Sequence, residues 1–331
     1  MWVHAFLKPL LKRGAVVAAA NWQVTLVQAT ADSLFKLLLA TPVIGGVFLV
    51  ALVLGSEPQQ MMSLEWREMA TTIVTSLLAH PAVLVAFLLA LGVVVVGGSL
   101  LVFLVKGGTV AILVQGERQA TTPDAAPLHL EDIASASAFT PEFFISSAEA
   151  VFPRYLALGS MLMGIYLVSG LAYLSFAFAV GLLGDGLGLA ALATLAFVGW
   201  ITIVNLVYLL IQIVIAADDC SVATAVQRVA AFMARERRRL LALFLVVLVL
   251  VVMATGASFI ATFALGLIGF VPFVGLAVLP IQLLAWIFRG LVFQFLGLSS
   301  IGAYLRLYRM YSGDAERESP VALPHPEAST P

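Results

Sequence analysis

The stretch Leu240–Ile268, which reads LLALFLVVLVLVVMATGASFIATFALGLI, contains no charged side chain. A helix rises 1.5 Å per residue and the hydrocarbon core of a bilayer is about 30 Å thick, so about 20 such residues cross it. The stretch therefore predicts a transmembrane helix.

Five other stretches have the same character. The six predicted spans are Leu34–Leu54, Ala82–Val105, Tyr155–Val180, Leu187–Ile215, Leu240–Ile268 and Phe273–Leu298. Within these limits the charged residues are Lys36 and Arg289, as expected in a solvent that penalises unpaired charge. The predicted fold class is all-α, a polytopic helical membrane protein with six transmembrane helices.

The overall composition agrees with this class. Of the 331 residues, 62% are apolar and 11% are charged, and the mean hydropathy is +1.08, which excludes a water-soluble globule. The net charge of -1 and the pI near 6.4 give no general attraction to nucleic acid, so no nucleic-acid partner is expected. Cys220 is the single cysteine, which excludes an internal disulfide and a thiolate metal cluster.

The basic residues predict the orientation. Of the 17 Lys and Arg residues, Arg67 lies in a predicted outer segment and Arg289 within a span, and all the others lie at or near the inner ends of the spans. The sequence therefore predicts a multi-pass protein of the inner (plasma) membrane with the N- and C-termini in the cytoplasm. The stretch 312–331 lacks periodicity and predicts a disordered cytoplasmic tail.

An approximate internal repeat suggests how the spans are grouped. When the second unit is aligned with the third so that Arg154 matches Arg239, Leu206 matches Leu291 and Val207 matches Val292. In the first unit Lys36 likewise directly precedes an apolar run, as Arg154 and Arg239 do. We therefore expect one membrane domain, 1–311, built from units 1–116, 117–218 and 219–311. Each unit would be a hairpin of two spans entered through an amphipathic inner-surface helix, and the first would carry an extra outer helix at 63–79.

The clearest predicted surface helix runs from Ser221, its expected N-cap, to Arg239. Asp218 and Asp219 precede it as expected capping acids, and its last turn is basic. Its candidate contacts for lipid headgroups or a partner protein are Arg228, Arg235, Arg237, Arg238 and Arg239. The alternative is an ordinary positive-inside anchor. Related segments are expected at 140–152, with Thr140 as its cap, and at 14–31, an amphipathic lead into the first span.

The order of Asp218-Asp219, an amphipathic helix and Arg237-Arg238-Arg239 before the fifth span resembles a group of bacterial six-span membrane proteins. This group includes the membrane region fused to some glycerophosphodiester phosphodiesterases. The resemblance implies the fold and a membrane location. It transfers no catalytic residue, because those enzymes carry their chemistry on a separate soluble domain.

No catalytic constellation emerges from the sequence. All four histidines lie outside the spans, and Asp218-Asp219 has no second aspartate-rich motif with which to hold magnesium and diphosphate. We therefore expect no enzyme, no cofactor and no metal site. The remaining hypotheses are an accessory or scaffolding protein that acts through lipids, a membrane-protein partner or a homo-oligomer, and a transporter or channel for a lipid or small solute.

Polar residues within or beside the spans bear on this choice. The candidate positions are Lys106, Asn205, Gln212, Gln282 and Arg289. They would line a water-accessible cavity in a transporter, or form bonds between helices in a scaffold. For Arg289 we weigh snorkelling to the inner interface against an inward pair with Asp218, Asp219 or Glu117.

Overall fold

The structure is a computed structural model that describes residues 2–54, 68, 71, 75, 78–120, 130–182, 187–269 and 274–318. Every secondary-structure element among them is a helix. The helices are α1 (Trp2–Ala20), α2 (Trp22–Leu54), α5 (Pro81–Gln119), α6 (Leu130–Ser135), α7 (Pro141–Leu182), α8 (Leu187–Asp218), α9 (Val222–Arg235), α10 (Arg237–Gly269) and α11 (Val274–Glu318). Six of them, α2, α5, α7, α8, α10 and α11, are long and apolar enough to cross a membrane, which confirms the predicted all-helical class with six helices of this kind.

Several of these helices are much longer than a membrane is thick. Helices α5, α7 and α11 have 39, 42 and 45 residues, so they are about 58 to 68 Å long, about twice the hydrocarbon core. The surplus length forms a packed unit at one end of the molecule, which we call the base. The base consists of α1, α6, α9 and the adjoining ends of the long helices, 105–119, 141–158, 208–218, 237–243 and 298–312. Large side chains that are fully buried in it include Tyr155, Phe232 and Tyr304.

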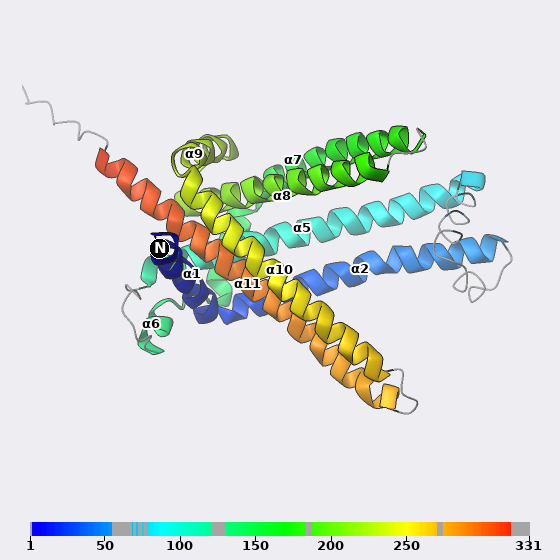
Figure 1. Cartoon of the computed structure of the whole chain (residues 1–331), viewed down its shortest axis with the longest axis horizontal. Helices are drawn as coiled ribbons and strands as arrows, with labels where there is room; N and C mark the ends of the chain where they lie inside the picture. Colours follow the sequence, from blue (N-terminus) through cyan, green and yellow to red (C-terminus); the bar gives the residue numbers. More distant parts are fainter. Residues whose placement is uncertain are drawn as a thin grey trace, which may run out of the picture.

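From the base the long helices diverge as arms (Figure 1). Helix α2 packs on α5, α7 on α8, and α10 on α11. Along the arms many large apolar side chains are exposed, for example Val93 at 72%, Phe178 at 72% and Phe259 at 73%. Such surface requires an apolar solvent, so the arms are the parts of the chain that suit the hydrocarbon core.

Helix α1 differs from the expected lead-in at 14–31. The chain breaks at Asn21, α1 packs mainly against α11 within the base, and α2 begins at Trp22. The Asn21 amide explains the break, because it donates to the carbonyls of Val17 and Ala136, both at 2.9 Å. Its Oδ1 accepts the backbone N–H of Ala138 at 2.8 Å. The first segment is therefore a core element, tied to the chain after α6.

The crossing of α1 and α11 requires glycine in both helices. A Cβ on Gly14 would lie 2.2 Å from the Ser299 carbonyl oxygen, and one on Gly302 would lie 2.8 Å from Gly14 Cα. The backbones thus approach more closely than any side chain allows, in the way that small residues permit close helix crossings.

Three predicted boundaries are wrong. The surface helix expected at 140–152 is the beginning of α7, although Thr140 does accept the N–H of Phe143 at 3.2 Å as its cap. The surface helix expected to reach Arg239 ends at Arg235, since the chain leaves the helix at Glu236 and α10 starts at Arg237. The expected tail begins as helix, because α11 continues to Glu318. The rest of that tail and most of the expected outer helix at 63–79 lie outside the described residues.

Candidate functional site

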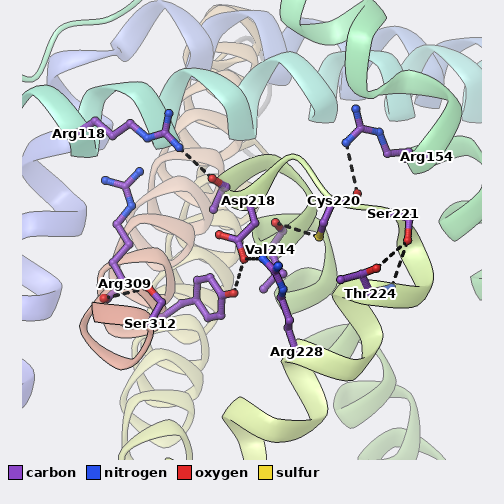
Figure 2. Close-up of polar contacts among 12 residues, drawn as sticks. Arg118, Arg154, Val214, Asp218, Cys220, Ser221, Thr224, Arg228, Arg309 and Ser312 are labelled. Carbon is purple, nitrogen blue, oxygen red and sulfur yellow. Dashed lines mark hydrogen bonds and ion pairs between the residues drawn. The ribbon is translucent and has the colours of Figure 1, made fainter. Parts of the chain in front are cut away.

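The turn between α8 and α9 joins several helices of the base (Figure 2). Asp218 ends α8, and its Oδ2 accepts the Tyr308 hydroxyl of α11 at 2.6 Å. The same oxygen pairs with Arg228 of α9, and this bond raises the pKa of the Arg228 guanidinium. Ser221 caps α9 by accepting the N–H of Thr224, which confirms the predicted cap.

Two further arginines bond to the same turn. Asp219, at a left-handed φ of 47° that Asp tolerates better than most residues, pairs with Arg154 of α7 at 2.6 Å. Arg154 also donates to the carbonyl of Cys220 at 3.3 Å, and Arg118 of α5 donates to that of Ala217 at 2.9 Å. A cation suits the Ala217 carbonyl because this residue lies in the last turn of α8. The two aspartates therefore act as ion-pair partners, and the side-chain cap of α9 is Ser221.

A buried ion pair lies deeper in the base. Arg13 Nε of α1 lies 2.8 Å from each carboxylate oxygen of Glu117 of α5, and the two residues are 5% and 2% exposed. Arg13 Nη2 also donates to the Ala120 carbonyl at 3.1 Å, and Arg306 Nη1 lies 3.6 Å from Glu117 Oε1. The two charges compensate each other where little solvent reaches them, so removal of Glu117 leaves the buried Arg13 guanidinium without its counter-charge.

The five arginines predicted to contact headgroups or a partner have different surroundings. Arg228 pairs with Asp218, Arg235 lies 5.9 Å from the Tyr311 ring, and Arg239 lies 4.9 Å from the Phe6 ring. Arg237 and Arg238 are exposed and have no hydrogen bond or ion pair with the described residues. Because these two open α10 instead of closing the surface helix, they stand at the unfavourable, positive end of a helix dipole.

The structure brings together three of the five candidate polar positions. Lys106, Asn205 and Gln212 line one cavity of about 350 Å³ where the arms meet the base. Asn205 Oδ1 accepts the Tyr166 hydroxyl at 2.5 Å, whereas Gln212 Nε2 is buried without a partner among the described residues. This cavity is therefore the leading candidate for a binding site among the residues that the structure describes.

The other two positions lie farther along the arms. Gln282 and Arg289 line a second cavity, of about 550 Å³, between α10 and α11. Gln282 donates to the Leu265 carbonyl at 3.3 Å and thus forms a bond between helices.

Arg289 does not form the inward ion pair that we considered. Its side chain is exposed, and its guanidinium lies 5.8 Å from the ring of Phe293 on its own helix. The three acids considered as its partners bond to other arginines: Asp218 to Arg228, Asp219 to Arg154, and Glu117 to Arg13. The inward-pair hypothesis is wrong, and the snorkelling hypothesis stays a prediction.

Sequence reasoning missed the residues that hold the base together. In the sequence, Arg13 contributed only to the distribution of Lys and Arg that predicts the orientation. Glu117 was considered only as a possible ion-pair partner of Arg289. Tyr155, whose hydroxyl donates to the Gln212 carbonyl at 2.8 Å, was assigned only to the apolar start of a span. One signal could have pointed to Glu117: it is an acid three residues after the apolar run that ends at Val114, where an unpaired carboxylate is costly.

No protein family, curated protein or solved structure matches this chain. Among the residues that the structure describes, no three His, Cys, Asp or Glu side chains are grouped as a metal site requires. Any functional assignment therefore depends on the geometry of the base, the arms and the cavity between them.

Proposed function

We propose that this chain is a multi-pass protein of the inner (plasma) membrane that acts without catalysis, as an accessory or scaffolding protein working through lipids or partner proteins. The observation that carries the proposal is the division of the molecule into two parts: a packed base held together by hydrogen bonds and ion pairs, and arms with exposed apolar side chains. Arms with exposed apolar faces offer surface to lipids, to a membrane-protein partner or to a second copy of the chain.

In the proposed arrangement the three packed helix pairs are transmembrane hairpins, corresponding to the three sequence units. The base lies on the cytoplasmic side, with α9 at the membrane surface. The predominance of Lys and Arg at the base supports this orientation, because basic residues are retained on the cytoplasmic side.

Arg237 and Arg238 are the arginines that best suit lipid headgroups in this arrangement. Both are exposed at the start of α10, directly after the break at Glu236. An anionic headgroup there would offset their repulsion with the positive end of the helix dipole.

The test compares the stability of the full-length protein in neutral and anionic lipid. We expect phosphatidylglycerol to raise the midpoint of thermal unfolding above that in phosphatidylcholine, and added salt to reduce the gain. Substituting both Arg237→Gln and Arg238→Gln should remove about 1 kcal/mol of the gain per arginine. Arg228→Gln is the matched control: its loss should lower stability equally in both lipids, because Arg228 pairs with Asp218.

Equal stabilisation by the two lipids, or an unchanged gain in the double variant, would contradict a role for these arginines in binding anionic lipid. The double variant should also be no less stable than the parent in neutral lipid, because it removes two cations from a helix N-terminus.

A transporter or channel for a lipid or small solute is the second candidate function. The observation that favours it is the gathering of Lys106, Asn205 and Gln212 around one cavity. Transport requires that the cavity connect with both sides of the membrane during a cycle. Flux of a lipid or solute through proteoliposomes that contain the purified chain would favour this candidate over a scaffold.

A further inference from the structure

The cavity at the junction of base and arms is formed by all three helix pairs. Its wall includes Gln28 of α2, Lys106 of α5, Gln212 of α8, Phe244 of α10 and Gln294 of α11. At about 350 Å³ it is at the small end of ligand sites. It has room for a headgroup, with any longer chains left between the arms.

Two buried hydrogen-bond donors in this wall lack partners among the described residues. They are Gln212 Nε2 and Thr109 Oγ1, in residues 2% and 1% exposed. The acceptor Gln28 Oε1 is also unpartnered. A buried polar atom without a hydrogen bond costs free energy, so these atoms would be stabilised by a partner from outside the chain, either a ligand or a water molecule.

Lys106 adds a positive charge to the same wall. Its ammonium lies 5.6 Å from the centre of the Tyr208 ring of α8, so the side chain extends into the molecule. Among the described residues no acid forms an ion pair with Lys106, and the Asp32 carboxylate pairs with Lys36 at 2.7 Å. The cavity thus combines a cation with unpaired donors, which is the chemistry of a site for an anion.

The depth of the cavity matches that of lipid phosphates. A core of about 30 Å that starts at Pro81, the far end of α5, ends about 20 residues later, near Leu101. Lys106 lies beyond that point by about 7 Å, within the headgroup layer. The same count from the far ends of α8 and α11 reaches Val207 and Gln294. Phe244, Val247 and Leu248 supply an apolar wall next to the polar one.

We propose that this cavity binds the phosphate headgroup of one phospholipid from the leaflet on the side of the base. Lys106 and the Thr109 and Gln212 donors hold the phosphate oxygens, and the acyl chains extend along the α10 wall between the arms. This proposal rests on the membrane placement in the proposed function and deepens it by naming the ligand class. It does not depend on Arg237 or Arg238.

The test measures lipid binding to the full-length protein in mild detergent by native mass spectrometry. The probes are phosphatidic acid, diacylglycerol and inorganic phosphate. We expect one phosphatidic acid per chain, with binding weakened at least about tenfold by Lys106→Gln, the effect of losing one charge-assisted hydrogen bond. Lys8→Gln is the matched control, because Lys8 is exposed and does not line the cavity, so its loss should change the affinity less than about twofold.

A second variant keeps the test decisive if Lys106→Gln fails to fold. Thr109→Val removes an unpaired donor at nearly constant shape, so the lipid-free protein should be at least as stable as the parent. Its affinity for phosphatidic acid should nevertheless fall. A fall in affinity with unchanged thermal unfolding supports a ligand site, since a purely structural residue would change both together.

Three results would overturn the proposal. The first is equal affinity of the parent, Lys106→Gln and Thr109→Val for phosphatidic acid. The second is equally tight binding of diacylglycerol, which would mean that the cavity recognises only apolar chains. The third is inorganic phosphate that competes at the same concentration as phosphatidic acid, which would identify the ligand as a free anion. None of these results changes the expected effect of Arg237 and Arg238 on the stability gained in anionic lipid. The proposed function is therefore tested separately from this cavity.

Discussion

At the scale of single residues, the Arg13–Glu117 pair makes a sharp prediction about stability. Glu117→Gln leaves the Arg13 guanidinium buried without its counter-charge, which should lower the free energy of unfolding by about 3 to 5 kcal/mol. Thermal unfolding of the purified protein, followed by circular dichroism, measures the loss. Replacing both charges, Arg13→Met with Glu117→Leu, should restore much of it, because neither charge is then left buried alone.

The control for this prediction is the exposed pair of Asp32 and Lys36, one helical turn apart on α2. Its atoms are as close, at 2.7 Å, but its side chains are 40% and 64% exposed. Asp32→Asn should therefore cost only about 0.3 to 0.5 kcal/mol. Similar losses for Glu117→Gln and Asp32→Asn would mean that the buried pair does not hold the base together.

At the scale of helices, the crossing of α1 and α11 limits what position 14 accepts. Gly14→Ala places a methyl group 2.2 Å from the Ser299 carbonyl oxygen and 2.7 Å from the Ala303 nitrogen, and both are backbone atoms. The helices must separate, which should cost about 1 to 3 kcal/mol in the same unfolding experiment. Gly164→Ala is the control, because its methyl group meets nothing within 4 Å and alanine favours a helix by about 0.5 to 1 kcal/mol. A harmless Gly14→Ala would show that α1 is not packed directly on α11.

At the scale of the whole molecule, the proposed orientation places the base in the cytoplasm, and Cys220 reports on it. Burial raises the pKa of the Cys220 thiol, so less of it is thiolate at neutral pH and its alkylation should accelerate as the pH rises past the ordinary value of 9.0. At any one pH, a membrane-impermeant thiol reagent should label inverted vesicles faster than intact cells. Equal rates in the two preparations would show that the orientation is wrong.

A cysteine on the opposite side serves as the control. Thr75 lies in the segment before α5, at the far ends of the arms, and its side chain is exposed. In a Cys220→Ser background, Thr75→Cys should be labelled faster in intact cells than in inverted vesicles.

Sequence was sufficient wherever the deciding property is local. The length and apolarity of each predicted span follow from the cost of placing charge in hydrocarbon, so six helices long and apolar enough to cross a membrane were predictable without any contact between them. The Ser221 cap was predictable for the same reason, since it satisfies an N–H of its own helix.

Tertiary structure decided everything that joins distant parts of the chain. Arg13 and Glu117 are 104 residues apart, and Lys106 and Gln212 line the same cavity from different helices. In a chain so rich in Leu, Val and Ala, many helix pairings bury similar apolar surface. The correct one is selected by a few glycine crossings and buried polar bonds, whose geometry exists only once the helices have packed.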